Sequence, residues 1–182
     1  MKWVDESPAP DWPAWPAERP LPAEGRWPRV LITGEVHRRV LGQLRRQPVE
    51  DGGLLLGIPY HLPQRPAEVA LIEVLDAVPA PSTSGTMVSL RMDGEVWSAA
   101  NRRLDALRER LPFVRIVGWY HSHPGFGAFF SDTDRRTQAA FFREAYGVGW
   151  CVDPSDDTHA CFVGAASAAV AFEFVDNETN IA

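Results

Sequence analysis

The alternation of hydrophobic and polar residues predicts a protein of mixed helices and strands. Apolar residues recur at spacings of three and four over residues 35–46 and 97–111, which is typical of amphipathic helices. A third helix is predicted from residue 131 to about 145. Short runs rich in Val, Ile and Leu predict strands. These runs cover residues 29–33, 53–57, 68–78, 113–120, 148–152, 158–164 and 168–175, with a further candidate at 87–91.

These elements predict an α/β (α+β) fold class, an α-β-α sandwich in which helices flank a mixed central sheet. A chain of 182 residues suffices for one packed domain, which we place at 29–182. Residues 1–28 contain four tryptophans and seven prolines, a composition that favours extended backbone. They are predicted to form an N-terminal arm. Because tryptophan is costly to expose, the arm is expected to lie against the domain or against a partner.

Composition and charge exclude several functional classes. Hydrophobic residues make up 45% and charged residues 23% of the chain, as in soluble proteins, and no apolar run approaches the ~20 residues of a membrane helix. The N-terminus lacks the apolar stretch of a secretory signal, which predicts a cytoplasmic location. A net charge of -6 with scattered arginines offers no basic surface for nucleic acid. Cys151 and Cys161 are too few for a disulfide scaffold and are expected to be buried hydrophobic residues.

Two histidines follow the predicted strand 113–120 at a spacing that suits a metal ion. His121 and His123 are two residues apart, so on a strand both imidazoles point to the same side. Such a pair is also common as two solvated side chains at a strand end. The spacing alone therefore leaves both interpretations open.

A carboxylate further along the chain strengthens the metal interpretation. Ser131 and Asp134 lie at the start of the third predicted helix, where they suit an ordinary helix-capping arrangement. The loop 124–130 can also bring Asp134 back to the two histidines as a third ligand. Two histidines and one aspartate leave a fourth tetrahedral position for water, which is the pattern of a catalytic zinc site.

Taken together, these motifs resemble the JAMM (MPN-plus, JAB) zinc metalloprotease family. His121-Ser122-His123-Pro124 with the later Ser131 and Asp134 is similar to the family signature, and Glu50 before the strand 53–57 is similar to its upstream glutamate and glycine-flanked strand. The resemblance covers about residues 29–175 and points to the branch with the proteasome-lid deubiquitinase. Abundant arginine with a single lysine suggests a prokaryotic member.

The resemblance implies a fold, a cofactor and a reaction. The fold would be the cytidine-deaminase-like JAMM/MPN fold with a curved sheet. One Zn²⁺ per chain would be held by His121, His123 and Asp134, with Glu50 as general base and acid and Ser131 stabilising the oxyanion. The reaction would be hydrolysis of the bond after the C-terminal tail of a ubiquitin-like modifier. The implied partners are that modifier, its conjugates and the activating and conjugating enzymes of its pathway, and residues around 82–94 would pair with the modifier's tail.

Other interpretations remain open at this point. The chain could be a non-catalytic MPN scaffold that binds a ubiquitin-like protein, or a metal phosphoesterase, although the intact motif favours a protease. Glu35 and Glu73 are rival bases, but neither is followed by a glycine-flanked strand. His37, His61 and His159 lie outside the motif and are taken as surface residues.

Overall fold

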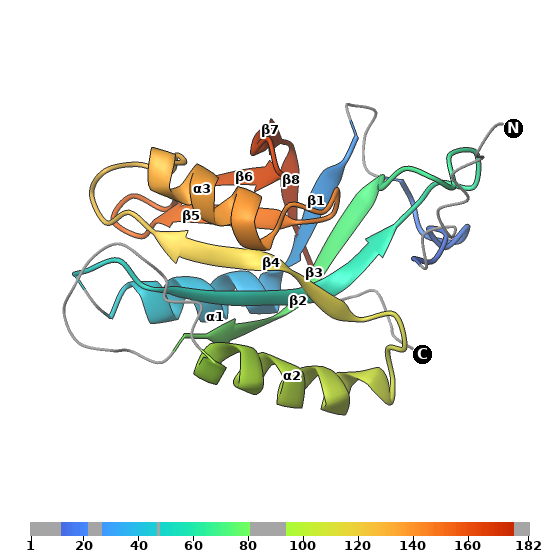
Figure 1. Ribbon diagram of the computed structural model, residues 1–182, viewed down its shortest axis with the longest axis horizontal. Coiled ribbons are helices and arrows are strands. Elements are labelled where there is room, and N and C mark those ends of the chain that lie inside the picture. Colours follow the sequence, from blue (N-terminus) through green and yellow to red (C-terminus); the bar gives the residue numbers. More distant parts are fainter. Residues whose placement is uncertain (1–11, 22–26, 47, 81–93, 177–182) are drawn as a thin grey trace, which may run out of the picture.

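One eight-stranded mixed sheet organises the computed structural model, which describes residues 12–21, 27–46, 48–80 and 94–176 (Figure 1). Among these residues, none of the helices is both long and apolar enough to cross a membrane. The elements in chain order are β1 (Arg29–Thr33), α1 (Gly34–Leu44), β2 (Gly52–Tyr60), β3 (Leu71–Pro79), α2 (Gly94–Arg108), β4 (Arg115–Ser122), α3 (Asp132–Phe141), β5 (Val148–Asp153), β6 (Thr158–Val163), β7 (Ala168–Val170) and β8 (Phe172–Val175).

The sheet curves until its two edges approach one another. Its strand order is β7-β6-β5-β4-β2-β3-β1-β8, so β7 and β8 are the two edge strands. Only Ala171 separates them in the chain, and one residue cannot span a flat sheet of this width (Figure 1). The sequence predicted one strand over 168–175. It is split because β7 pairs with β6, whereas β8 pairs in parallel with β1.

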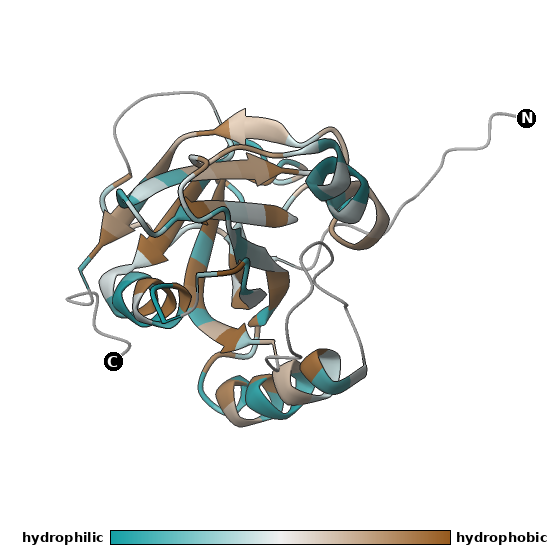
Figure 2. Ribbon diagram, turned by 90° about the vertical axis from the view of Figure 1, so that its left-hand side faces the viewer, coloured by the Kyte–Doolittle hydropathy of each residue, from teal (hydrophilic) through white to brown (hydrophobic). Residues whose placement is uncertain are grey.

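Helices cover both faces of this sheet, as the predicted sandwich requires. The amphipathic face of α1 packs into one hydrophobic cluster through Val36, Val40, Leu41 and Leu44. Helix α2 packs into the opposite cluster, and Figure 2 shows hydrophobic strand segments between the helices. Thr33 caps α1, accepting a hydrogen bond from the Val36 N–H. The structure is thus a mixed α+β fold with a curved sheet, and the likeness to cytidine deaminases stays a prediction.

Several element boundaries differ from the sequence prediction, and two of these differences have a clear local cause. Strand β2 continues through Pro59 instead of ending at residue 57, because its pairing with β4 ends at Gly57 and Pro59 has no β4 neighbour that needs its missing N–H. Helix α3 ends at Phe141 instead of about 145. The buried Gln138 side chain donates to the carbonyl of Phe142, which turns the chain away. The candidate strand 87–91 and most of the segment 82–94 lie outside the described residues.

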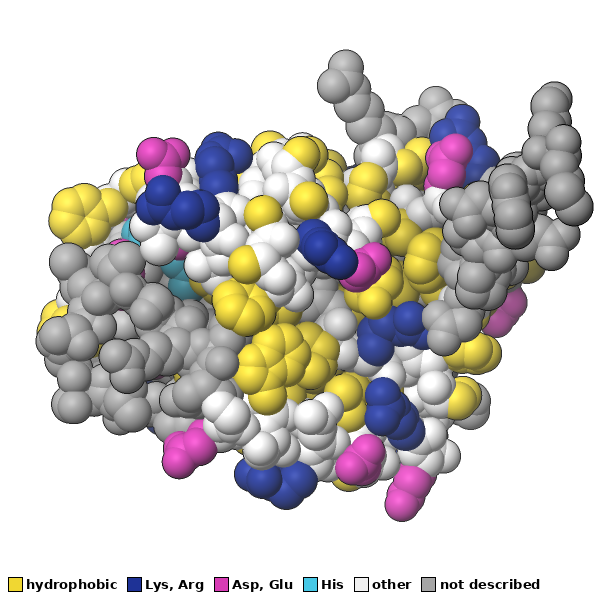
Figure 3. Space-filling model, in the orientation of Figure 1, with side chains coloured by type: hydrophobic (Ala, Val, Ile, Leu, Met, Phe, Trp, Pro, Cys, Tyr) yellow, Lys and Arg dark blue, Asp and Glu magenta, His cyan; other side chains and the backbone are white. Residues whose placement is uncertain are grey.

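An apolar hollow lies between α2 and α3 on the face seen in Figure 3, where hydrophobic side chains gather near the centre. Phe141 is 55% exposed at its edge. An exposed apolar surface of this kind is a common contact area for another protein. The residues that line it include Trp97, Ile116, Phe141, Phe142 and Tyr146.

The described part of the predicted arm, residues 12–21, lies against the domain. Trp15 is only 5% exposed and packs edge-on against Tyr60 at 5.0 Å between ring centroids. The Arg19 guanidinium stacks 4.1 Å from the Trp15 ring centroid and forms a two-pronged ion pair with Glu73 on β3. The backbone of Trp15 also donates to the His61 carbonyl. A domain boundary at residue 28 stays a prediction.

Replacement of Trp15 tests whether this contact stabilises the domain. We expect Trp15→Ala to lower the free energy of unfolding by about 3 kcal/mol, because it empties a buried aromatic site. Urea unfolding followed by circular dichroism measures the change. Leu21→Ala, at a side chain that is 52% exposed in the same segment, is the matched control and should change stability by less than about 0.5 kcal/mol. Equal effects of the two substitutions would show that the segment is not a structural part of the domain.

Candidate metal centre

Strand β4 delivers the two histidines to the centre of the sheet, between β2 and β5. His121 is near the end of the strand and His123 follows it, and both are 5% exposed. The indole of Trp119, two residues earlier on the same face, stacks on the His121 ring at 4.4 Å between centroids. The N–H of His123 donates to the Val152 carbonyl on β5 at 2.9 Å. Stacking on Trp119 thus positions His121, and the backbone hydrogen bond to β5 positions His123.

The start of α3 brings Asp134 to both histidines. Its Oδ1 lies 3.3 Å from His121 Nε2, and its Oδ2 lies 3.5 Å from His123 Nε2. Ser131 and Asp134 also form the capping box expected from the sequence, and the Ser131 hydroxyl donates to Asp134 Oδ2 at 2.6 Å. The same pair of residues therefore caps the helix and orients the carboxylate.

Glu50 reaches the same place from the residue pair that precedes β2. Its Oε1 lies 3.8 Å from His123 Nε2, and its side chain is 28% exposed. The neighbouring Asp51 is held by Ser122, whose N–H donates to the Asp51 carbonyl at 2.9 Å and whose hydroxyl accepts from the Asp51 N–H. Sequence reasoning assigned no role to Ser122. Its position between the two histidines places it on the opposite face of the strand, which was the one sequence feature that could have indicated a supporting role.

These residues fit a zinc ion held by the Nε2 atoms of both histidines and by Asp134. Both ring nitrogens of His121 are buried, and neither has a hydrogen-bond partner in the described part of the chain. Tetrahedral zinc with bonds of 2.0–2.1 Å places its ligand atoms about 3.3 Å apart. The distance from His121 Nε2 to Asp134 Oδ1 is 3.3 Å and that from His123 Nε2 to Oδ2 is 3.5 Å, so each histidine lies at about this separation from a different oxygen of the carboxylate.

The charge states of His123 and Asp134 also suit a metal. Burial and the neighbouring His121 lower the pKa of His123, so its ring is neutral near pH 7, as a ligand must be. Burial alone would raise the pKa of Asp134, but the His121 imidazole and the hydrogen bonds from Ser131 outweigh it and lower this pKa to about 2. Asp134 is therefore ionised near pH 7, where His123 is neutral.

A family model describing prokaryotic homologues of the JAB domain matches residues 34–163. This span contains the five residues that resemble the family motif, namely Glu50, His121, His123, Ser131 and Asp134. The chain belongs to this JAB family. The resemblance seen in the sequence is thus confirmed at the level of the JAMM/MPN family.

Curated relatives agree with this assignment. The chain is 37% identical over 94 residues to the 26S proteasome regulatory subunit RPN11 of Candida glabrata, covering 52% of this chain and 28% of that protein. It is 35% identical over 108 residues to the ubiquitin carboxyl-terminal hydrolase RPN11 of Saccharomyces cerevisiae, covering 59% of this chain and 32% of that protein. The chain thus spans about a third of the length of these relatives.

A solved structure shares the fold. The solution structure of a Desulfitobacterium hafniense protein superimposes with a TM-score of 0.63 at 18% sequence identity. The match covers 84% of this chain and 98% of that one. At this identity the likeness shows a common fold.

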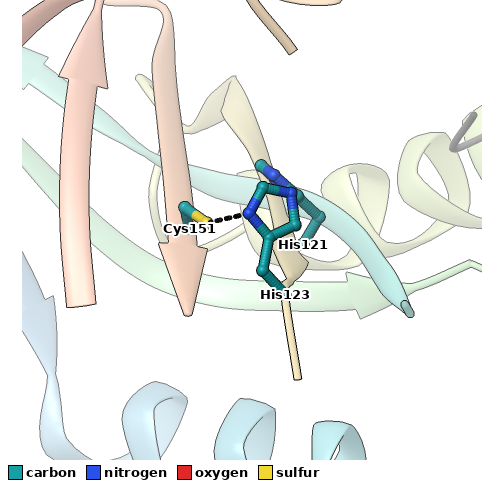
Figure 4. A group of neighbouring side chains, drawn as sticks. All are labelled: His121, His123 and Cys151. Carbon is teal, nitrogen blue, oxygen red and sulfur yellow. Dashed lines mark hydrogen bonds between the residues drawn. The ribbon is translucent and has the colours of Figure 1, made fainter. Parts of the chain in front are cut away.

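Cys151 lies beside the candidate metal centre. Its Sγ is 3.6 Å from His123 Nδ1, and Figure 4 shows the thiol on β5 facing that side of the ring. Burial raises the pKa of this thiol to about 12. Both cysteines are buried and free, as the sequence predicted. The contact with His123 was not foreseen, because it depends on the parallel pairing of β4 with β5.

Asp153 holds the loop that carries the chain from the histidines to α3. Its two carboxylate oxygens accept hydrogen bonds from the N–H groups of Gly125 and Gly127 at 2.9 and 2.7 Å. Both glycines have positive φ angles, 79° and 84°, where other residues are strained. Burial alone would raise the pKa of Asp153, but these donors and the N–H of Ser155 outweigh it and lower this pKa to about 2.

A second group of His37, Asp157 and His159 could also hold a metal by distance alone. His159 Nε2 lies 2.9 Å from Asp157 Oδ1, and His37 Nε2 lies 3.7 Å from it. However, the indole N–H of Trp150 donates to His159 Nδ1, so the neutral ring carries its proton on Nε2 and donates it to Asp157. We interpret this group as a hydrogen-bonded cluster. The prediction that His159 is a surface residue is wrong, because its side chain is 6% exposed.

The rival bases considered from the sequence have other positions. Glu73 is 6% exposed on β3, and its carboxylate is occupied by Arg19 and by the Tyr60 hydroxyl. Glu35 lies in the first turn of α1. Glu50, by contrast, places its Oε1 3.8 Å from His123 Nε2.

Asp153→Asn tests the charged anchor of the loop. We expect it to lower the free energy of unfolding near pH 6 by about 1–3 kcal/mol, because a carboxylate that accepts several N–H groups becomes a weaker amide acceptor. The folded pKa of Asp153 is about 2 and an unfolded aspartate titrates near 3.9, so the contribution is complete above about pH 4 and disappears as pH falls towards 2. Urea unfolding at pH 6, 4 and 2.5 measures the difference from wild type.

The matched control is Asp105→Asn, at a carboxylate that is 76% exposed. Its stability difference from wild type should stay small at every pH. If the loss of unfolding free energy in Asp153→Asn did not shrink as the pH falls, the ionised carboxylate would not be what anchors the loop.

Proposed function

We propose that the chain is a JAMM-type zinc isopeptidase that hydrolyses the bond after the C-terminal tail of a ubiquitin-like modifier. The observation that carries this proposal is the convergence of His121 Nε2 and His123 Nε2 on the Asp134 carboxylate, with Glu50 3.8 Å from the second histidine. Membership of the JAB family supports it. The proposed cofactor is one Zn²⁺ per chain at this centre, held by His121, His123 and Asp134.

Glu50 is the proposed general base and acid. An amide carbonyl is a poor electrophile, and zinc, when bound, supplies a Lewis acid that lowers the pKa of a coordinated water from 15.7 to about 7. The Glu50 carboxylate, partly open to solvent at the rim of the centre, accepts the proton of the attacking water. It then returns that proton to the amine nitrogen as the bond to the carbonyl carbon breaks. Atoms balance, because water adds its hydroxyl to the carbonyl and its proton to the amine.

Ser131 is the proposed donor to the developing oxyanion. Its hydroxyl stands at the N-terminus of α3, where the helix dipole also favours negative charge. In the structure this hydroxyl donates to Asp134 Oδ2. Rotation about one bond would redirect its proton to a carbonyl oxygen bound at the centre.

The proposed substrate and partners follow from the relatives and from the surface. The matched yeast protein is named a ubiquitin carboxyl-terminal hydrolase, which supports a ubiquitin-like modifier, its conjugates and its activating and conjugating enzymes as partners. Phe129 packs 4.9 Å from the His123 ring, and Phe126 is 78% exposed in the same loop, so both offer apolar contacts to the leaving group. The hollow between α2 and α3 offers the modifier a second surface. The cytoplasmic location stays a prediction.

Glu50→Gln is the direct test of the reaction. The zinc-loaded chain is incubated with a ubiquitin-like protein joined through its C-terminus to a lysine side chain of a reporter. We expect the wild type to release the reporter and Glu50→Gln to lower kcat by about 10²–10⁴-fold with its metal content unchanged, because the amide cannot accept the proton. Glu68→Gln, at a carboxylate that is 66% exposed, is the matched control and should cleave at the wild-type rate.

Other outcomes distinguish the alternatives. Equal cleavage by wild type and Glu50→Gln would remove Glu50 from the mechanism. Binding of the modifier without cleavage would identify a non-catalytic scaffold. Hydrolysis of a phosphate ester, with the isopeptide left intact, would identify a phosphoesterase. In the same assay Ser131→Ala should lower kcat by about 10²-fold, the cost of losing one oxyanion donor.

A further inference from the structure

The second ring nitrogen of a metal-binding histidine usually donates to a hydrogen-bond acceptor. A neutral imidazole that binds a metal through Nε2 carries its proton on Nδ1, and the partner of that N–H sets the tautomer and the direction of the ring. For His123 the partner of Nδ1 is the Sγ of Cys151, at 3.6 Å (Figure 4). A thiol sulfur is a weak acceptor, so it can accept a hydrogen bond from this N–H.

The pairing of β4 with β5 fixes this contact. Cys151 is opposite His121 in the parallel register, and the His123 N–H donates to the carbonyl of Val152, the next residue on β5. Cys151 belongs to the same hydrophobic cluster as Trp119, on the face that carries the histidines. It is 0% exposed and His123 is 5% exposed, so water does not compete easily for Nδ1.

Cys151 also qualifies by distance as a ligand itself, in a group with His121 and His123. The geometry of the His123 ring decides against that role. Its two ring nitrogens point in different directions. The carboxylate oxygens of Asp134 and Glu50 lie 3.5 and 3.8 Å from Nε2, whereas Sγ lies 3.6 Å from Nδ1. Since His121 Nε2 also faces Asp134, an ion at the Nε2 atoms joins three ligands and leaves the sulfur on the far side of the ring.

We propose that Cys151 is a positioning residue, which accepts a hydrogen bond from His123 Nδ1–H and so holds Nε2 towards the metal. This inference rests on the proposed zinc centre. It gives the two histidines different supports, because His121 is held by the stacked indole of Trp119 and His123 by a hydrogen bond to sulfur. His159 shows the opposite arrangement, since its Nδ1 faces an N–H donor.

Metal affinity of the full chain tests this role. The apo protein is titrated with Zn²⁺, and with Co²⁺ as a coloured substitute, for wild type and for Cys151→Ala, Cys151→Ser and Cys161→Ala. Cys161 is the matched control, because it is the other buried free cysteine, 2% exposed on β6. We expect one equivalent bound in every case, with affinity about 10-fold lower in Cys151→Ala. Cys161→Ala should match the wild type, and Cys151→Ser should recover part of the loss because its hydroxyl also accepts a hydrogen bond.

Two results would overturn the inference while leaving the zinc centre intact. One is equal metal affinity of Cys151→Ala and Cys161→Ala, which would mean that Cys151 only fills space. The other is a thiolate-to-cobalt charge-transfer band in the wild type that disappears in Cys151→Ala, which would make the sulfur a ligand. Failure of the wild type to bind either metal would instead overturn the zinc centre, and the inference with it.

Discussion

The hydrogen bonds on the two sides of the C-terminal end of β4 are the constraint on which the candidate centre depends. On one side Ser122 N–H donates to the Asp51 carbonyl, and on the other His123 N–H donates to the Val152 carbonyl, both at 2.9 Å. The first bond brings Glu50, the neighbour of Asp51, to the histidines. The second brings β5, which carries Cys151, to the same place. Glu50 precedes the histidines by some seventy residues in the chain, so backbone pairing alone makes them neighbours.

The two faces of β4 make different contacts. Trp119, His121 and His123 share the face covered by α3, and the Trp119 indole donates to Gln138 of that helix at 2.7 Å. The opposite face anchors the strand, because the Tyr120 hydroxyl donates to Gln43 of α1, and Gln43 in turn donates to the Asp51 carboxylate. Alternation along one strand thus places the proposed metal ligands on one face and the hydrogen bonds that anchor the strand on the other.

Much of this arrangement was predictable from the sequence. Periodicity located the three helices and most strands, because each buries one regular face, and the motif identified His121, His123 and Asp134 as candidate ligands. The supporting residues were not predictable, because Ser122, Cys151 and Asp153 act through pairings between β2, β4 and β5 that local patterns do not encode. The split at Ala171 was missed for the same reason, since β7 and β8 differ in their partners more than in their composition.

Location of the bound metal by X-ray diffraction at the zinc absorption edge is the most direct test of the central claim. Crystals of the full chain grown with zinc should give an anomalous difference peak bonded to His121 Nε2, His123 Nε2 and an oxygen of Asp134, at about 2.0–2.2 Å from each. The Sγ of Cys151 should remain outside bonding distance. A peak bonded to Sγ and His123 Nδ1, or the absence of any peak between the two histidines, would contradict the account.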